Sequence, residues 1–212
     1  MSINPVAIVT GGSRGVGAAT ATILSANGWN VLVTCSSSIE AANIVAAECS
    51  SEISEVIAIK ANVANDEDCI HSVETAIKKW GRIDAVVNNA GTTKFVWNHG
   101  DLEGIDAADF QNIYSVNVIG PFQMVRASKM HLLKSDNPNI INVSSIGGLK
   151  GIGSSIAYAA SKGALNSMTV SMARNLGPIK VHAVCPGFIE GEWLKKGMGE
   201  ERFEATKTHI EN

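Results

Sequence analysis

Basic clusters, long apolar runs and paired cysteines are all scarce in this sequence of 212 residues. Lysine and arginine number 17 against 20 acidic residues, so the formal net charge is −3, and no polybasic tract indicates a nucleic-acid partner. No stretch approaches the roughly 18–20 consecutive apolar residues of a membrane span. The sequence therefore predicts neither a nucleic acid nor a membrane as partner.

The four cysteines lie far apart in the sequence and include no Cys-x-x-Cys pair. We expect them to be reduced packing residues of a cytoplasmic protein. The N-terminal apolar run Val6–Val9 is too short for a signal peptide and lacks a charged leader. The five histidines lack the spacing and the nearby carboxylates of a metal site, so no metal is expected.

What the sequence does contain is an alternation of short β-rich apolar runs with longer amphipathic segments. Such alternation is typical of right-handed βαβ units, which build a parallel sheet with helices on both faces. The sequence thus predicts an α/β fold with a doubly wound parallel sheet of the Rossmann type, a three-layer sandwich forming one domain over residues 1–212. The predicted strands are Val6–Thr10, Val31–Thr34, Val56–Lys60, Ile83–Asn88, Ile140–Val143 and Val181–Val184. Helices are expected near 16–27, 39–51, 66–80, 106–134 and 155–176, with Gly120-Pro121 dividing the fourth into two.

The C-terminal part of the sequence lacks a further strand. Nothing after Ile189 predicts a buried strand, because residues 192–212 are mostly charged and suit a helix. The run Val181–Val184 would then be an apolar edge strand, which invites pairing unless something covers it. We expect the sheet to lack its final strand, and the biological chain to continue beyond Asn212 with an apolar segment beside Val181–Val184.

The first predicted strand leads directly into a glycine-rich turn and an alanine-rich helix. The turn reads Thr10-Gly11-Gly12-Ser13-Arg14-Gly15-Val16-Gly17. Gly11 permits a tight turn, and Gly15 and Gly17 allow a pyrophosphate and the sheet to approach the backbone. The amides and the positive dipole end of a helix N-terminus favour phosphate groups. This context predicts a dinucleotide-binding site.

The spacing Thr-Gly-x-x-x-Gly-x-Gly resembles that of the short-chain dehydrogenase/reductase family, in the single-domain branch that includes the β-ketoacyl-carrier-protein reductases. The resemblance extends from residue 6 to about residue 191 and implies a nicotinamide dinucleotide as cofactor. Folds that prefer NAD usually place an acid after the second strand to bind the ribose 2′-hydroxyl. Here Ser36 follows Cys35, and the first acid is Glu40. Ser36 and Arg14 could instead bind a 2′-phosphate, so the sequence favours NADP(H), with NAD(H) as the alternative.

Further cofactor contacts follow from the resemblance. Asn62-Val63 stands where the family commonly has Asp-Val, which implies an adenine contact by Asn62 and packing of Val63 on the ring. Asn89 and Gly91 belong to a motif like the family's Asn-Asn-Ala-Gly beside the ribose. A Pro-Gly turn meeting the nicotinamide is implied after the sixth strand, although Gly191 replaces the usual threonine. The implied cofactor-binding residues are Gly11, Ser13, Arg14, Gly15, Val16, Gly17, Ser36, Asn62, Val63, Asn89, Gly91, Tyr158, Lys162, Pro186, Gly187 and Ile189.

Tyr158 and Lys162 are four residues apart within a predicted helix, so both side chains lie on one face. A free tyrosine titrates near pKa ~10, and an adjacent cation favours its phenolate. Such a pair can move a proton at a carbonyl or alcohol oxygen. The resemblance adds Ser145, thirteen positions before the tyrosine, as the group that binds the substrate oxygen. It also adds Asn117, which kinks its helix and holds a water near the lysine.

These residues predict an oxidoreductase that transfers a hydride between NADP(H) and a small-molecule carbonyl or alcohol substrate, with a carrier-linked acyl group as one candidate. Tyr158 would be the proton donor or acceptor. The alternative is a dinucleotide-binding protein or fragment without catalytic activity. The resemblance also implies a homodimer or homotetramer, formed through the long helices after Asp106 and Ser155.

Overall fold

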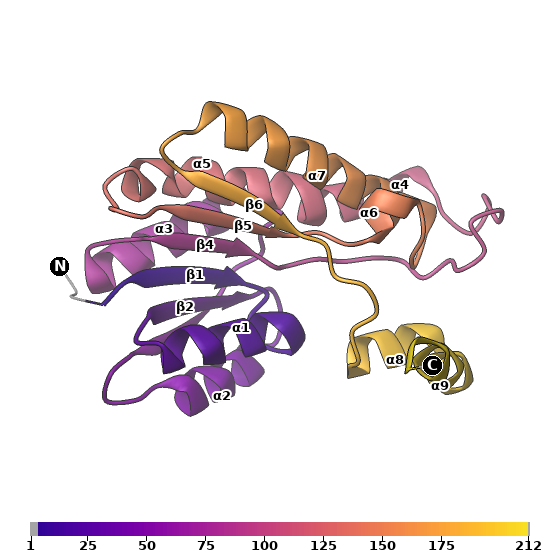
Figure 1. Ribbon diagram of the computed structural model, residues 1–212, viewed down its shortest axis with the longest axis horizontal. Helices are drawn as coiled ribbons and strands as arrows, with labels where there is room; N and C mark the ends of the chain where they lie inside the picture. The colour runs from indigo at the N-terminus through magenta and orange to yellow at the C-terminus, as the bar shows by residue number, and fades with distance from the viewer. Residues whose placement is uncertain (1–3, 212) are drawn as a thin grey trace.

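The structure, a computed structural model, describes residues 4–211. Its centre is one sheet with the strand order β3-β2-β1-β4-β5-β6, and every neighbouring pair of strands is parallel (Figure 1). The order reverses direction between β1 and β4, which makes their carboxyl ends the switch point of a doubly wound fold. The strands are β1 Val6–Thr10, β2 Asn30–Cys35, β3 Val56–Lys60, β4 Ala85–Asn88, β5 Asn139–Val143 and β6 Lys180–Val184. The predicted fold class and all six strands are confirmed.

Helices cover both faces of the sheet, with α1 and α2 on one side and α3, α5 and α7 on the other (Figure 1). The helices of the two layers are α1 Gly15–Ala26, α2 Ile39–Cys49, α3 Asp66–Trp80, α4 Ala107–Tyr114, α5 Gly120–Leu132 and α7 Ile156–Asn175. Three shorter or more distant helices are α6 Gly147–Lys150, α8 Glu192–Met198 and α9 Glu200–Glu211.

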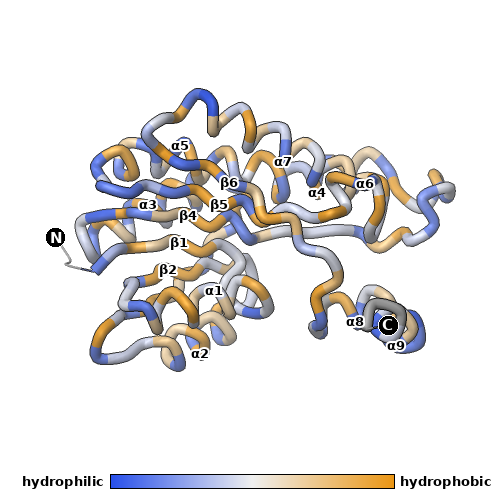
Figure 2. The backbone as a smooth tube through the Cα atoms, viewed as in Figure 1, coloured by the Kyte–Doolittle hydropathy of each residue, from blue (hydrophilic) through white to orange (hydrophobic). Residues whose placement is uncertain are grey.

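The central strands are apolar because they are buried on both faces. Ile8 packs into the core beneath α3 and α5, whereas its neighbour Val9 packs into the core beneath α1 and α2. A strand between two helix layers has no solvent face, so its residues form a continuous apolar run. Figure 2 shows β1 and β2 mostly in orange, whereas the C-terminal α9 is largely hydrophilic.

β6 forms one edge of the sheet in the described part of the chain. Val181 is buried, but Val184 remains 51% exposed. An apolar hollow of about 370 Å³ lies on the same sheet face as α1, and its lining includes Leu24, Ile141 and Val184. The prediction that Val181–Val184 is the last strand of the sheet is confirmed for residues 4–211.

The expected division at Gly120-Pro121 is confirmed in part, because α5 begins at Gly120. The chain stays helical from α4 into α5 through a π-helical turn, Ser115–Ile119, and Pro121 lies in the first turn of α5. A proline is tolerated there because its missing N–H lies where the regular bonding pattern is already interrupted. The two helices are therefore joined by a π turn centred on Asn117, and the helical path between them is not broken.

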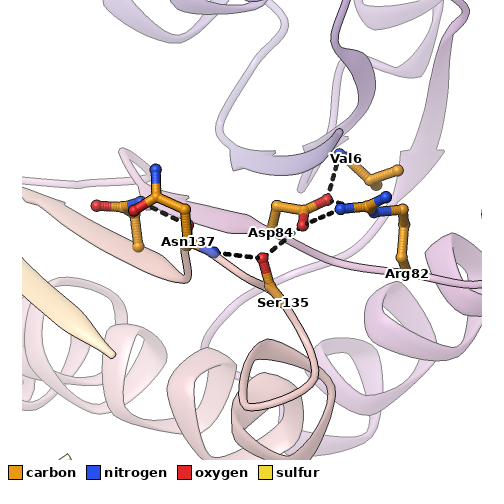
Figure 3. A network of polar contacts seen from close by, with 6 residues as sticks. Val6, Arg82, Asp84, Ser135 and Asn137 are labelled. Carbon is orange, nitrogen blue, oxygen red and sulfur yellow. Dashed lines mark hydrogen bonds and ion pairs between the residues drawn. The ribbon is translucent and has the colours of Figure 1, made fainter. Parts of the chain in front are cut away.

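A buried carboxylate, that of Asp84, connects the amino-terminal ends of neighbouring strands, at the sheet edge opposite the glycine-rich turn. Asp84, 4% exposed, accepts hydrogen bonds from the Val6 amide at 2.8 Å and the Ser135 hydroxyl at 2.5 Å (Figure 3). The guanidinium of Arg82 donates to both carboxylate oxygens, at 2.9 and 2.7 Å. Asp84 thereby ties the start of β1 to the segments before β4 and β5.

Candidate active site

The glycine-rich turn joins β1 to α1 at the switch point of the sheet. Gly11 has a φ of +66°, and a Cβ there would lie 2.9 Å from the Cα of Ala90. A Cβ on Gly17 would collide with the Gly11 carbonyl and the Asn89 amide. The Asn89 Nδ2 donates to the carbonyls of Thr10 and Gly11 at 2.9 and 3.0 Å. Glycine is thus required at both positions, and Asn89 holds the turn against the end of β4.

The N-terminus of α1 presents backbone amides without acidic neighbours. The helix begins at Gly15, its first turn contains no acidic residue, and Arg14 before it is exposed. Gly12 donates to the Thr34 carbonyl at 2.9 Å, which brings the turn beside the end of β2. The exposed Ser36 follows that strand. Free amides, Arg14 and Ser36 fit the phosphates of a dinucleotide, and no carboxylate directly follows β2.

The remaining members of the turn differ in their surroundings. Ser13 is partly exposed, as the prediction of a cofactor contact requires. Gly15 has a φ of +56° and open space where a Cβ would be. The side chain of Val16 instead lines the apolar hollow beside α1, together with Pro186.

The two residues after β3 are placed differently from each other. Asn62 is exposed, and its Oδ1 accepts from the Ala64 amide at 3.1 Å, which leaves a second lone pair for a ligand. Val63 is only 6% exposed, and a Cβ on Gly120 would lie 2.7 Å from it. Val63 therefore packs mainly in the core against α5, and little of it is left for stacking on an adenine ring.

Tyr158 and Ser145 come together from α7 and the end of β5. Tyr158 is partly exposed, and a hydrogen bond between its phenol and the Ser145 side chain acts to lower its pKa. Burial acts more strongly in the opposite direction and leaves the pKa of Tyr158 above its ordinary value. The neighbouring Ser144 is 4% exposed, and its hydroxyl is directed to the Lys162 carbonyl at 3.2 Å. Of the two serines, Ser145 is the one beside Tyr158.

Lys162 follows Tyr158 by one helical turn, and its ammonium lies 5.8 Å from the centre of the tyrosine ring. The ammonium donates to the Val143 carbonyl at 2.8 Å. Burial lowers the pKa of Lys162 to about 8, while nearby Cys185 acts weakly in the opposite direction. The i, i+4 spacing predicted a lowered pKa for Tyr158. That direction is wrong here because burial of the phenol dominates.

Asn117 is fully buried in the π turn, and every polar group of its side chain is bonded. Its Oδ1 accepts from the Thr92 amide at 2.8 Å, and its Nδ2 donates to the Thr92 carbonyl and the Ser161 hydroxyl, both at 3.0 Å. A Cβ on Gly91 would lie 3.5 Å from the Asn117 Oδ1 and 3.7 Å from the Lys162 Nζ. Asn117 thus joins the loop after β4 to α7 close to the lysine.

The turn after β6 reaches the same region. Pro186 accepts from the Ile146 amide at 2.9 Å, which places it beside the residue that follows Ser145. Gly187 is exposed, and Ile189 is 43% exposed. Gly191 precedes α8 and offers no hydroxyl. The four predicted catalytic residues and the Pro-Gly turn therefore gather at the carboxyl ends of β4, β5 and β6.

Sequence reasoning missed part of the hydrogen-bonding support. Asn88 donates to Asn142 at 2.9 Å, and Asn142 donates to the Thr169 hydroxyl at 2.8 Å. These buried groups link β4, β5 and α7 beneath the site. Asparagines within apolar strands were the available signal, since a buried amide requires a partner. Ser161 and Thr92, the partners of Asn117, had no comparable signal.

Neither a membrane-spanning helix nor a metal-binding cluster is found in the part of the chain that the structure describes. No helix there has the length and apolar character needed to cross a membrane. Within the same residues, no three histidine, cysteine or acidic side chains gather where they could bind a metal ion.

The sequence matches the family model described as short chain dehydrogenase over residues 5–201. It is 39% identical over 192 residues to ketoacyl reductase 2 assigned to the granaticin polyketide synthase of Streptomyces violaceoruber, covering 90% of this chain and 75% of that protein. It is 38% identical over 186 residues to a 3-oxoacyl-[acyl-carrier-protein] reductase of Synechocystis, covering 87% of this chain and 74% of that protein.

Solved structures agree with this result. A protein of Burkholderia xenovorans assigned to the short-chain dehydrogenases/reductases is 42% identical, with a TM-score of 0.87, over 94% of this chain and 83% of that one. An NAD⁺-bound xylitol dehydrogenase is 27% identical, with a TM-score of 0.84, over 97% of this chain and 78% of that one.

The fold, the glycine-rich turn and these matches define a nicotinamide-dependent oxidoreductase of carbonyl and alcohol groups. This chain belongs to the short-chain dehydrogenase/reductase family and is similar to the 3-oxoacyl-carrier-protein reductases.

Proposed function

We propose that this protein is an NADP(H)-dependent reductase of carbonyl compounds in which Tyr158 donates the proton. The observation that carries the proposal is that α7 brings Tyr158 and Lys162 to the end of β5, because the Lys162 ammonium lies 5.8 Å from the centre of the Tyr158 ring and donates to the Val143 carbonyl, two residues before Ser145. These three groups come from α7 and the end of β5, beside the turn that fits a dinucleotide. Their arrangement provides two hydroxyl donors for one substrate oxygen.

When bound, the nicotinamide supplies the hydride for carbonyl reduction. Ser145 donates a hydrogen bond to the substrate oxygen and stabilises the negative charge that develops there. Tyr158 transfers its phenolic proton to the same oxygen. Its raised pKa keeps the phenol protonated at neutral pH, as an acid in the reductive direction must be.

Lys162 provides a nearby positive charge once the phenol has lost its proton. A pKa of about 8 means that the ammonium can exchange a proton near neutral pH. Asn117 acts through its neighbours: its bonds to Thr92 and Ser161 fix the loop after β4 against the helix that carries Tyr158. We propose that Lys162 and Asn117 together support return of the proton to Tyr158.

The preference for NADP(H) rests on Arg14 and Ser36. Both are exposed, and they stand at the adjoining ends of β1 and β2. An arginine and a hydroxyl favour a 2′-phosphate, whereas a carboxylate after β2 would repel it. The xylitol dehydrogenase to which this chain is similar was solved with NAD⁺, so family membership alone does not select the cofactor.

The proposed substrates are ketones and β-keto esters, including acyl chains linked to a carrier. The two ketoacyl reductases to which the chain is similar motivate this choice. The active form is proposed to be a homodimer or homotetramer. Apolar residues at helical spacing on one face of residues 119–133, which include α5, remain exposed, and this suits a contact with a second copy. They are Ile119, Phe122, Met130 and Leu133.

A steady-state assay tests the proposal. Purified protein is mixed with NADPH or NADH and a panel of ketones and β-keto esters, and loss of nicotinamide absorbance is followed. We expect turnover that is faster with NADPH. Tight binding of NADPH without reduction of any carbonyl, together with no oxidation of the corresponding alcohols in the presence of NADP⁺, would instead identify a dinucleotide-binding protein that is not an enzyme.

A further inference from the structure

A cluster around Trp97 holds α8 and α9 against the loop that follows β4. The Trp97 Nε1 donates to the Gly197 carbonyl of α8 at 3.0 Å. The Arg202 guanidinium of α9 lies 4.6 Å from the centre of the indole ring. The ring of Phe95, in the same loop as Trp97, has its centre 5.4 Å from that of the indole. One indole ring thus contacts both helices. We call these four residues the Trp97 cluster.

The loop that carries Trp97 is also bonded to the segment beside Tyr158. Val96, next to Trp97, donates from its amide to the Ser154 carbonyl at 2.7 Å. His99 bonds the Gly153 carbonyl at 3.1 Å. A Cβ on Gly153 would lie 3.4 Å from the Tyr158 ring, so this segment packs directly against it. The Trp97 cluster is therefore connected to Tyr158 through two short backbone segments.

The other end of the helical pair starts from the turn after β6. Phe188 in that turn packs against Phe203 of α9, with ring centres 5.2 Å apart, and Phe203 is only 6% exposed. Ile189 in the same turn and Ile152 beside Gly153 are 43% and 47% exposed. Apolar surface is thus available on both of the segments that the cluster holds together.

We propose that Trp97 is a specificity-determining residue that limits the bulk of the carbonyl substrate by fastening α8 and α9 to the loop after β4. The inference rests on the proposed reductase function. A substrate larger than the space between the two fastened segments has to displace the helices, and the bonds of Trp97 oppose that movement. Small ketones reach Tyr158 without displacing them.

Two substitutions weaken the cluster from opposite sides. Trp97→Ala removes the indole together with its bond to Gly197 and its contact with Arg202. Gly197→Ala places a methyl group where the Phe95 ring now lies, which forces that ring to move. Alanine is also the better helix former, so α8 itself is not weakened. Leu102→Ala is the matched control, because Leu102 lies in the same loop as Trp97 and its side chain is 65% exposed.

The first measurement compares kcat/KM for a small β-keto ester, ethyl acetoacetate, with that for a bulky bicyclic ketone, 1-decalone. In Trp97→Ala and Gly197→Ala we expect the kcat/KM for 1-decalone, divided by that for ethyl acetoacetate, to rise roughly tenfold. A change of that size is the scale of one lost packing contact in a specificity pocket. The KM for NADPH should not change, and the control should match the wild type. A general loss of structure would lower both values and leave the ratio unchanged.

The second measurement is limited digestion with trypsin, which cleaves after Lys195 and Lys196 of α8. We expect cleavage there to be several-fold faster in both variants and unchanged in the control. A wild type that turns over both compounds, with the same ratio and the same cleavage rate in all variants, overturns the inference and leaves the proposed function intact. A wild type that reduces no member of the panel of ketones and β-keto esters removes the proposed function and the specificity role together, while faster cleavage would still establish the contact of Trp97 with α8.

Discussion

Replacing Asp84 should destabilise the protein more than replacing any exposed acid. The Asp84→Ala change leaves the amide of Val6, which is fully buried, without its acceptor, and that alone costs about 1–3 kcal/mol. It also removes the partner of Arg82, whose side chain is 32% exposed and can in part be hydrated. We expect a total loss of about 3 kcal/mol, toward the lower end for breaking a buried ion pair. Asp84→Asn keeps one acceptor oxygen and should lose about 1–2 kcal/mol.

Urea denaturation followed by circular dichroism measures these differences. Asp136→Asn is the control, because Asp136 is exposed and lies next to Ser135, and its change should stay within about 0.5 kcal/mol. A loss below about 1 kcal/mol for Asp84→Ala would show that the network in Figure 3 does not stabilise the sheet. An unchanged m-value is required for the comparison.

The same network predicts a dependence on pH. Burial alone raises the pKa of Asp84, but hydrogen bonds from Arg82, Ser135 and the Val6 amide outweigh it, so the pKa lies below its ordinary value. The stabilisation by Asp84 is therefore complete above the ordinary value near ~4 and is lost as the pH falls through the lower folded value. The advantage of the wild type over Asp84→Asn should shrink below about pH 4. A difference that stays constant down to pH 2 would contradict this reasoning.

Two further predictions concern the cofactor and the assembly. Ser36→Asp should shift the ratio of kcat/KM for NADH to kcat/KM for NADPH toward NADH by at least about tenfold, since a carboxylate repels the 2′-phosphate and binds the 2′-hydroxyl. A variant that still favours NADPH as strongly as the wild type would show that the end of β2 does not select the cofactor. Met130→Glu combined with Phe122→Glu should reduce the mass found by light scattering to that of one chain, whereas Leu102→Glu, on an equally exposed loop residue, should leave it unchanged. A wild type that is already monomeric would refute the assembly.

The strands and the glycine-rich turn were predictable because their physical causes are local. A strand buried on both faces must be an apolar run, and a turn with a φ of +66° at Gly11 must contain glycine. Of the two serines, only Ser145 acts on the pKa of Tyr158, whereas the Ser144 hydroxyl is directed to the Lys162 carbonyl. Their catalytic roles remain predictions.

Other features depend on contacts between distant segments. At the π turn Asn117 is bonded to Thr92 and Ser161, and local sequence reveals neither contact, so the prediction named only the start of α5 at Gly120 and not the turn before it. The pKa of Tyr158 depends on how deeply the ring is buried, and the spacing to Lys162 carries no information on that. The packing of Val63 against α5 likewise depends on a contact between distant segments, which the sequence around Val63 does not reveal.

The central claim is that the Tyr158 hydroxyl donates the proton during carbonyl reduction. Tyr158→Phe removes only that hydroxyl, and single-turnover oxidation of bound NADPH by a ketone measures the chemical step directly. We expect a loss of at least about two orders of magnitude in that step, while the Kd for NADPH, followed by nicotinamide fluorescence, stays within about twofold. A variant that reduces the ketone at a rate near that of the wild type would contradict the mechanism.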